Sequence, residues 1–206
     1  LLPHYLSGVT GGRINPKPNL TFNQLAASVG VVDGDNSFGH HIGTYAMNRA
    51  KSLAADTGIG AVAIKNSSHC GALSYFGNNA AEAGMIGMVL THATSRVRSA
   101  NGTRPFFGNN PICFMAPMHD EDAFCFHSAT TTTTFNSIKH ALEKGESLPP
   151  GCAADRLGQE TLDPRLAEQL IPIGDYKGFG LSMVVDVLCG ILTGMATGDE
   201  VSQMFD

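Results

Sequence analysis

A histidine, a cysteine and a glycine in succession make residues 65–71 the part of the sequence best suited to chemistry. His69, Cys70 and Gly71 lie between a short apolar run and an expected helix. Folds that alternate helices and strands place chemistry at the carboxyl ends of buried strands, and imidazole exchanges protons near neutral pH. Gly71 lets a ligand approach the backbone closely. We therefore predict an acid/base role for His69; the alternative is a core histidine that bonds a backbone carbonyl.

A second polar cluster lies in residues 174–180, again in a loop that leads into a helix. Lys177 stands between Asp175 and Gly178 at the start of an apolar segment. A cation is unfavourable at a helix N-terminus because of the helix dipole, so we expect an anion to accompany it. A nucleotide phosphate suits both groups, since helix N-termini and lysine bind phosphate. The alternative is a surface lysine paired with Asp175.

The cysteines are odd in number, scattered and without a Cys-x-x-Cys pair: Cys70, Cys113, Cys125, Cys152 and Cys189. This pattern is typical of free, mostly buried thiols in a reducing compartment, so we expect a cytoplasmic protein. Cys70 beside His69 also invites a Cys–His nucleophile. Adjacent residues on an extended chain point to opposite sides, which favours a small apolar role for Cys70 instead.

Further polar residues have weaker patterns. His40 and His41 do not predict a metal site, because adjacent side chains diverge and no third ligand has a useful spacing. His92 follows an expected strand and could line a pocket near His69 if their strands are neighbours; the favoured alternative is a surface histidine at the end of a strand. The hydroxyls of residues 130–134 could donate to a ligand, and Asn109-Asn110 could present amides to one or shape a turn.

These side chains need elements that position them, and the apolar periodicity predicts helices alternating with short strands. Residues 24–32 alternate weakly before a turn at 33–36. Residues 1–15 are expected to contain the tail of a helix that closes at Gly11-Gly12. Further helices are expected at 42–57, 73–84, 137–144, 165–170 and 179–192, and strands at 61–65, 85–91, 111–117 and 123–127. This alternation indicates the α/β class, and the length predicts one domain, or a large part of one, over residues 1–206. Neither a Gly-x-Gly-x-x-Gly fingerprint nor a P-loop is present, so a nucleotide would be bound by other means.

Composition excludes several classes of protein. The chain is 43% hydrophobic and 15% charged, which is typical of a globular protein and not of a disordered one. The formal charge of −5 and the lack of a basic patch argue against a nucleic-acid partner. We expect no membrane span, because no apolar run reaches the roughly 18 residues required. The apolar residues 184–195 include Asp186 and are expected to form a core helix.

Six segments taken in order resemble one enzyme family. The segments are 66–71 (NSSHCG), 107–111 (FGNNP), 127–131 (HSATT), 145–155 (GESLPPGCAAD), 158–164 (GQETLDP) and 175–181 (DYKGFGL). Together they resemble the malate/L-lactate dehydrogenase-like family, which includes ureidoglycolate and sulfolactate dehydrogenases. Each piece alone is weakly specific, but their order and spacing over nearly the whole chain make the combination specific.

The resemblance implies an NAD- or NADP-dependent homodimeric oxidoreductase with an α/β, non-Rossmann nucleotide-binding fold. It would interconvert a 2-hydroxy acid and a 2-oxo acid by hydride transfer, with His69 as the acid/base and Tyr5 lining the substrate site. The cofactor-binding residues that it implies are Thr91, His92, Ala93, His127, Ser128, Ala129, Thr130, Lys177 and Gly178. No residue identifies NAD in preference to NADP.

Three departures from the family pattern change what can be expected. The sequence begins at Leu1, where the family has an arginine preceded by a histidine, and His127 stands where the family has aspartate. The family also continues beyond Asp206, so we expect a chain truncated at both ends. A non-catalytic relative that binds nucleotide or serves a structural role is therefore the main alternative. A Cys70–His69 hydrolase is a third possibility.

Overall fold

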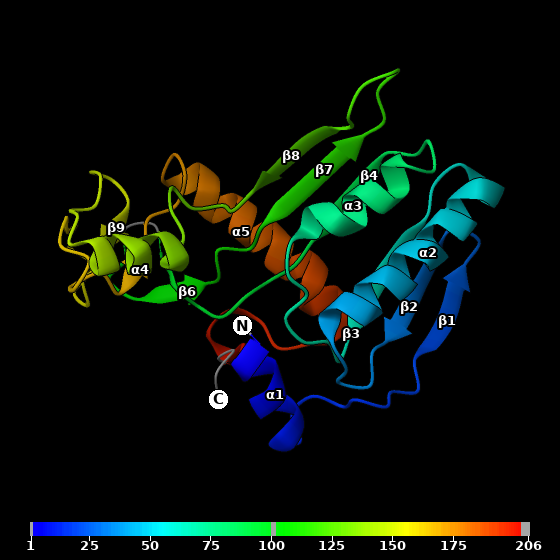
Figure 1. Ribbon diagram of the computed structural model, residues 1–206, viewed down its shortest axis with the longest axis horizontal. Coiled ribbons are helices and arrows are strands. Elements are labelled where there is room, and N and C mark those ends of the chain that lie inside the picture. The colour runs from blue at the N-terminus through cyan, green and yellow to red at the C-terminus, as the bar shows by residue number, and fades with distance from the viewer. Residues whose placement is uncertain (1, 100–101, 203–206) are drawn as a thin grey trace.

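The computed structural model describes residues 2–99 and 102–202 as a mixed arrangement of helices and small sheets (Figure 1). The helices are α1 (Leu2–Thr10), α2 (Gly39–Thr57), α3 (Leu73–Ala81), α4 (Phe135–Lys144) and α5 (Tyr176–Cys189), followed by the 3-10 helices η1 (Ile191–Thr193) and η2 (Gly198–Glu200). The strands are β1 (Thr21–Ala26), β2 (Val29–Asp33), β3 (Ala61–Lys65), β4 (Gly87–Leu90), β5 (Val97–Arg98), β6 (Pro105–Phe107), β7 (Ile112–Ala116), β8 (Phe124–Ser128), β9 (Ala153–Ala154) and β10 (Gln169–Leu170). The mixed helix and strand class expected from the sequence is confirmed.

The first sheet, in the order β1-β2-β3, leads into the loop that carries His69. β1 and β2 form an antiparallel hairpin, while β2 and β3 are parallel and are joined through α2. A parallel pair requires such a crossover, and α2 buries its apolar side on the sheet. Val32, Ile42 and Ala46 form the core between the two layers. The helix ends at Gly58, whose φ of 84° favours glycine.

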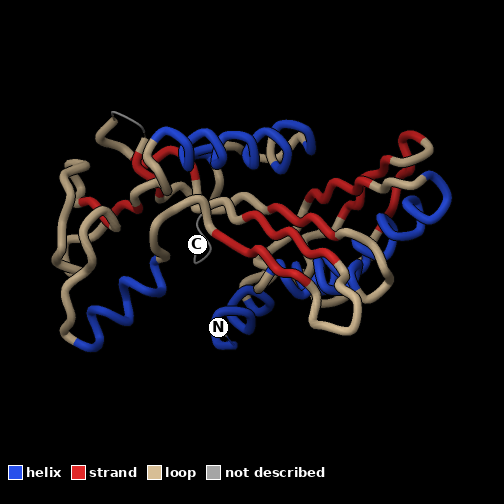
Figure 2. Tube along the Cα trace, turned by 90° about the horizontal axis from the view of Figure 1, so that it is seen from above, coloured by secondary structure: helices blue, strands red, loops and turns tan. Residues whose placement is uncertain are grey.

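The second sheet, in the order β4-β7-β8, is antiparallel throughout and is covered on one face by α3. Leu73 and Ala81 of the helix pack with Cys113 and Met115 of β7. The helix approaches β4 closely, because a Cβ on Gly87 would lie 2.6 Å from the carbonyl oxygen of Gly77. Figure 2 shows α5 on the opposite side of the strands from α2 and α3.

The third sheet, in the order β6-β5-β10-β9, packs against α4. Its core consists of Val97, Ile138, Leu148, Ala153 and Leu170. The hydroxyl of Thr134 caps α4 by accepting a hydrogen bond from the backbone nitrogen of Ser137 at 3.2 Å. Sequence periodicity does not reveal this sheet, because three of its strands are two residues long.

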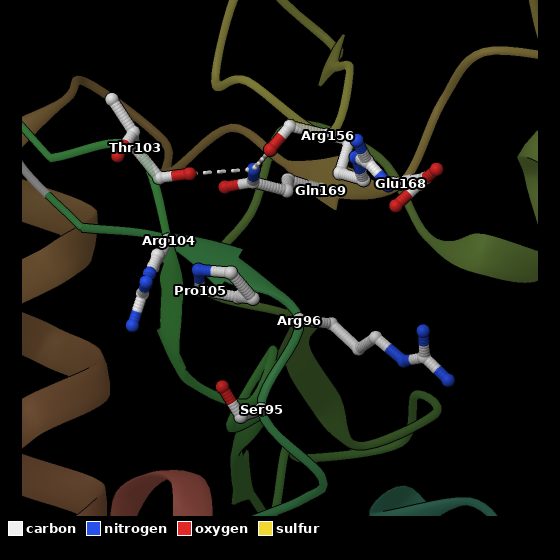
Figure 3. A pocket seen from close by; sticks show the side chains of 8 residues that line it. All are labelled: Ser95, Arg96, Thr103, Arg104, Pro105, Arg156, Glu168 and Gln169. Carbon is white, nitrogen blue, oxygen red and sulfur yellow. Dashed lines mark hydrogen bonds between the residues drawn. The ribbon is translucent and has the colours of Figure 1, made fainter.

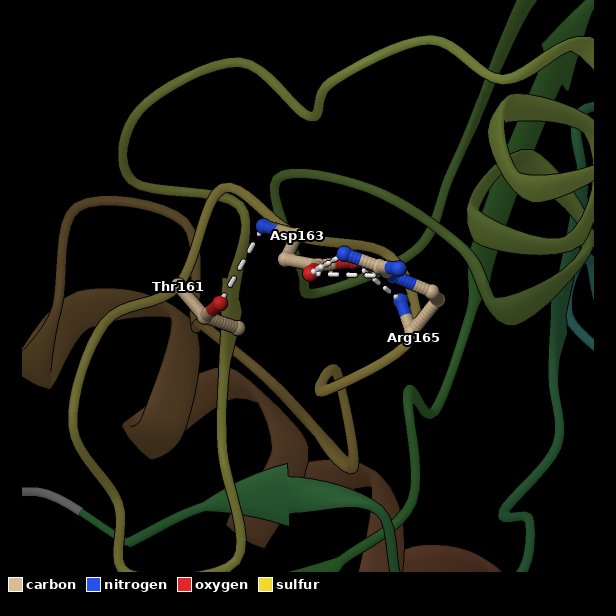
Figure 4. A network of polar contacts seen from close by, with 3 residues as sticks. All are labelled: Thr161, Asp163 and Arg165. Carbon is tan, nitrogen blue, oxygen red and sulfur yellow. Dashed lines mark hydrogen bonds and ion pairs between the residues drawn. The ribbon is translucent and has the colours of Figure 1, made fainter.

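The weakly alternating residues 24–32 include the turn of the β1–β2 hairpin, which residues 27 and 28 form. One expectation about elements was wrong. Residues 165–170 are not a helix: Asp163 accepts hydrogen bonds from the backbone nitrogen and the guanidinium of Arg165, which fixes a turn before β10 (Figure 4). Such local bonding competes with helix formation.

The expectation that no apolar run is long enough to span a membrane was also wrong. Residues Tyr176–Thr193 form an 18-residue helical segment that meets that test by length and composition, and 28% of it is buried. One such segment is weak evidence for a membrane protein. Asp186 within it is 3% exposed and accepts a hydrogen bond from the backbone nitrogen of Gly198 at 2.9 Å, so the segment is anchored to the folded chain.

Candidate active site

The His69 loop is held rigidly between β3 and the start of α2. Ser68 donates a hydrogen bond from its hydroxyl to the carbonyl oxygen of Ser37 at 2.8 Å and accepts one from the backbone nitrogen of Gly39 at 3.1 Å. The Asn66 amide donates to Asp33 at 2.9 Å, and Asn66 itself is left-handed (φ 52°). These bonds fix the loop, so His69 has a defined position at the end of the strand.

Tyr5 and His69 are brought together from sequence positions 64 residues apart. The Tyr5 hydroxyl and His69 Nδ1 lie 2.6 Å apart in a hydrogen bond whose donor depends on the imidazole tautomer. His40 completes a triangle of rings, with its centroid 5.5 Å from that of Tyr5 and 6.3 Å from that of His69. α1, α2 and the loop after β3 each contribute one ring. The predicted substrate residue and the predicted catalytic residue are therefore direct partners.

The electrostatics of this cluster favour a neutral imidazole. Burial lowers the pKa of His69, and the positive charges of His40 and His4 lower it further. Burial raises the pKa of the Tyr5 hydroxyl, and the charge of the Cys70 thiolate adds to that rise. His69 therefore exists mainly as the neutral base near pH 7, where it can take up a proton and return it.

Cys70 is positioned as a packing residue. Burial raises the pKa of its thiol, and its side chain packs against the core of Leu73 and Cys113. Because the thiolate is the nucleophilic form, a raised pKa lowers the reactivity of the residue. The geometry therefore favours the small apolar role over the Cys70–His69 hydrolase.

The topology of the second sheet brings several predicted cofactor residues to one edge. β4 and β8 both flank β7 in antiparallel register, so their carboxyl ends lie at the same edge as the start of β7. Residues 91–93 leave the end of β4, and residues 128–130 leave the end of β8. The two segments therefore emerge side by side, separated by the residues that lead into β7.

A buried network of polar groups ties these segments to α5. The Asn110 side-chain oxygen accepts a hydrogen bond from the backbone nitrogen of Ala93 at 3.0 Å, and its amide donates to the carbonyl oxygen of Ser182 at 2.8 Å. The hydroxyls of Ser182 and Thr130 lie 2.6 Å apart, and Thr130 also donates to the carbonyl oxygen of Asn109 at 3.0 Å. Ala93 and Thr130 are thus joined through α5.

Gly178 is packed against the Thr130 segment. A Cβ on Gly178 would lie 2.5 Å from both the carbonyl oxygen of Thr130 and the backbone nitrogen of Ile173, so no larger residue fits. Lys177 stands next to it, exposed, in the first turn of α5. The cap residue Asp175 makes no side-chain hydrogen bond to the helix. The helix N-terminus and the Lys177 ammonium therefore suit an anion bound beside the Thr130 segment.

His92 lies in a different environment from the one expected. β3 and β4 belong to different sheets, so the condition under which His92 would line a pocket near His69 is not met. Burial lowers the pKa of His92, while the Asp186 carboxylate and the carbonyl of Ala196 oppose that effect. Burial raises the pKa of the neighbouring Cys189 to about 11. His92 is therefore packed against the end of α5.

The remaining predicted residues line the same edge with less burial. His127 is exposed on β8, the outer strand of its sheet, and is paired with Cys113. Ser128 donates from its hydroxyl to the carbonyl oxygen of Ala129 at 2.8 Å, and Thr91 donates to that of His92 at 3.3 Å. Both hydroxyls thus have local partners.

Sequence reasoning missed the groups that join these segments. Asn110 appeared only as one of two possible ligand or turn residues, and it is fully buried with φ of 24°. Ser182 lies inside an apolar helix, where a lone serine gives no pattern to recognise. His40 was considered only as a metal ligand. Within residues 2–99 and 102–202, no three His, Cys, Asp or Glu side chains are grouped as a metal site.

One cavity lies away from the Tyr5–His69 pair. An open cavity of about 290 Å³ is lined by three arginines and by Gln169 (Figure 3). Arg96 and Arg104 point in different directions in that view, so their charges do not converge on one ligand. The Gln169 amide donates to the carbonyl oxygens of Thr103 at 2.9 Å and Asp155 at 3.0 Å, which is a structural role.

Comparison with known proteins gives a consistent result along the whole chain. The sequence pattern of the family described as malate/L-lactate dehydrogenase matches residues 1–206. A ureidoglycolate dehydrogenase (NAD(+)) from Escherichia coli O157:H7 is 32% identical over 98% of this chain and 58% of its own length. A malate dehydrogenase from Pyrococcus abyssi is 35% identical over 94% of this chain and 56% of its own length.

The solved structures agree. The sulfolactate dehydrogenase from Methanocaldococcus jannaschii superimposes with a TM-score of 0.92 at 31% identity, and the match covers 100% of this chain and 60% of that one. A malate dehydrogenase from Entamoeba histolytica gives a TM-score of 0.89 at 28% identity over 95% of this chain and 58% of its own. The chain therefore spans somewhat more than half the length of these relatives.

Proposed function

Because this chain belongs to the malate/L-lactate dehydrogenase family, we propose that it is part of an oxidoreductase that interconverts a 2-hydroxy acid and a 2-oxo acid with NAD or NADP. The observation that carries the proposal is the 2.6 Å hydrogen bond between Tyr5 and His69. It joins the acid/base candidate to the substrate candidate in a cluster where burial, together with the charges of His40 and His4, lowers the pKa of the imidazole.

His69 exchanges the proton at Nε2 in this proposal. Nδ1 stays bonded to Tyr5, donating to the hydroxyl oxygen, which leaves Nε2 free to accept the proton of a substrate hydroxyl. In the reverse direction the imidazolium returns that proton to the carbonyl oxygen. The nicotinamide cofactor, when bound, supplies or takes up the hydride. Tyr5 fixes the ring orientation, so that proton exchange occurs at one atom.

The residues at the sheet edge fit a nucleotide. Lys177 and the N-terminus of α5 suit its phosphate. Because Gly178 has no side chain, the start of α5 packs directly against the Thr130 segment. Residues 91–93 and 127–130 would hold the remainder. Three small sheets, two of them wholly or mainly antiparallel, support a nucleotide-binding fold other than the doubly wound parallel sheet.

The assembly and location remain part of the same proposal. We expect residues 1–206 to act as one oxidoreductase region of a cytoplasmic homodimer, because the cysteines are free in the described chain and α5 exposes apolar side chains. A non-catalytic nucleotide-binding relative is the second candidate, since His127 stands exposed where the family pattern has aspartate.

A fluorescence titration with NADH and then NADPH tests the proposal, and the absence of tryptophan simplifies the signal. Saturable binding and turnover of a 2-oxo acid are expected, with one nucleotide preferred. The variant His69→Gln should keep nucleotide affinity and lose about 10²-fold or more of turnover, as general acid/base catalysis requires. Binding without any turnover would favour the non-catalytic relative, and no binding by the folded protein would refute both.

A further inference from the structure

Arg13 carries a positive charge that is not matched by a carboxylate. Its side chain is half-buried, and Nη2 lies 3.1 Å from Nε2 of His4. No ion pair found in the described chain includes Arg13. A guanidinium stays protonated at any ordinary pH, so its positive charge is permanent. Its polar partner is therefore an imidazole, which offers a lone pair but no negative charge.

The fold holds Arg13 in place at the end of α1. Ile14, the next residue, is 1% exposed and donates from its backbone nitrogen to the carbonyl oxygen of Gly8 at 2.8 Å. Gly12 turns the chain in a left-handed conformation (φ 77°). A Cβ on Gly8 would lie 2.7 Å from Ile14 and 3.4 Å from Nη2 of Arg13, so the guanidinium lies along the helix. The backbone of residues 8–14 therefore fixes the position of the Arg13 charge.

The same helix connects Arg13 to the proposed active site. His4 precedes Tyr5, and their ring centroids are 5.8 Å apart. Tyr5 bonds His69 directly, and the charges of both His4 and His40 reach His69 strongly enough to lower its pKa. The charged groups that act on His69 are therefore the basic side chains of His4 and His40, and Tyr5 adds a neutral hydrogen bond. Basic groups around a site attract anions. The Tyr5 ring lies between His4, the partner of Arg13, and the imidazole of His69.

We propose that Arg13, held in place by His4, binds a carboxylate of the substrate. This assignment rests on the proposed function, because it takes the Tyr5–His69 pair as the reaction centre. Arginine presents parallel N–H groups that match the two oxygens of a carboxylate, and the His4 imidazole orients the guanidinium by accepting from Nη2. The carboxylate is either the one next to the reacting carbon or a second acidic group at the far end of the substrate.

The test is the binding of oxamate, a 2-oxo acid analogue, by the full-length protein saturated with its nucleotide. Calorimetry should show that Arg13→Gln weakens oxamate binding about tenfold or more, as the loss of a charge-assisted bond requires, while nucleotide affinity stays unchanged. Arg13→Lys should restore part of the affinity. The matched control is Arg165→Gln, which removes an exposed arginine paired with Asp163 in the turn of Figure 4.

Steady-state kinetics separate the two possible carboxylates. If Arg13 holds the one beside the reacting carbon, Arg13→Gln raises KM for mono- and dicarboxylic 2-oxo acids alike, with kcat changed little. If it holds the distal one, only dicarboxylic substrates are affected. If Arg13→Gln turns over substrate with unchanged oxamate affinity and unchanged KM for every substrate, the assignment of Arg13 is wrong while the proposed reaction stands. Arginine-dependent oxamate binding without turnover would support it and refute the proposed reaction.

Discussion

His69 has two basic neighbours, His40 and His4, so its proton affinity reports directly on the cluster. The charges of His40 and His4 act together with burial, the largest cause, to lower its pKa below 6.5. We predict that the acid limb of kcat/KM for hydroxy-acid oxidation lies below pH 6.5. His40→Gln should move this limb to higher pH, because one repelling charge is removed. A pH–rate profile that does not move would show that His40 does not act on His69.

The same shift makes a prediction about stability. An imidazole with a lower pKa in the folded chain binds protons less well there than in the unfolded chain, whose value is near 6.5. Its contribution to stability is therefore complete above that pH and is lost as the pH falls through the folded pKa. Urea unfolding between pH 7 and 5 should show a smaller loss for His69→Gln than for the wild type. The exposed His41→Gln variant should retain the wild-type loss.

At the level of residues, sequence alone could predict the groups that stand in loops. His69 follows a strand and precedes a glycine, and Lys177 opens an apolar helix, so their positions carried a signal. Ser182 carried none, because its role depends on a neighbour far along the chain: it meets Thr130, 52 residues away. Arg13 carried none either, because its link to His69 runs through Tyr5, which lies 64 residues from that histidine. The place of Tyr5 in the substrate site came from family resemblance, and its hydrogen bond with His69 was not predicted.

Among the elements, α5 is the one that joins the proposed cofactor residues, and it offers a matched pair of glycines. Gly178→Ala places a Cβ 2.5 Å from backbone atoms of Thr130 and Ile173, whereas Gly180→Ala meets nothing within 4 Å. We predict that Gly178→Ala destabilises the fold by about 1–3 kcal/mol and weakens nucleotide binding. Gly180→Ala should be neutral or stabilising, by up to about 1 kcal/mol. Denaturant unfolding and nucleotide titration of both variants would check this; equal effects would contradict it.

Asn110 gives a second prediction about how the elements are joined, because its side chain links the end of β4 to α5. Its two side-chain bonds, to Ala93 and to the Ser182 carbonyl, are both buried or half-buried. Asn110→Ala would leave the Ala93 N–H without its partner, at about 1–3 kcal/mol if that group stays dry, and would remove the second hydrogen bond of the Ser182 carbonyl. We expect a lower unfolding midpoint in denaturant together with weaker nucleotide binding. Normal binding would place the cofactor away from this edge.

The elements with long apolar patterns were predictable, and the short ones were not. The spacing at 42–57 and the strand at 61–65 correspond to α2 and β3 in the structure. The helix expected at 165–170 failed because a side-chain bond from Asp163 fixes a turn there, and Gln169 then enters β10 fully buried. A two-residue strand such as β10 forms only because it pairs with neighbouring strands, so the local sequence has no periodicity that predicts it.

The whole molecule exposes an unusual amount of apolar surface on α5. Val184, Val187 and Leu188 are 52%, 40% and 41% exposed, and the helix continues into Ile191 and Leu192 at 64% and 68%. A soluble chain rarely leaves a contiguous apolar face in water, because covering it is favourable by roughly 25 cal/mol per Å². The sequence hid this feature, since apolar composition alone predicted a core helix.

We therefore predict that this 206-residue chain self-associates through α5. Val184→Glu combined with Leu188→Glu introduces two charges one turn apart on the exposed face, so sedimentation should show a lower average mass at the same concentration. Leu157→Glu is the control, because Leu157 is 62% exposed in a loop and stands outside the helix. Asp186 must be left unchanged, since its carboxylate anchors the helix to Gly198. If the double variant sediments like the wild type, the contact that joins the copies lies elsewhere, and the exposed face of α5 is tolerated as free surface.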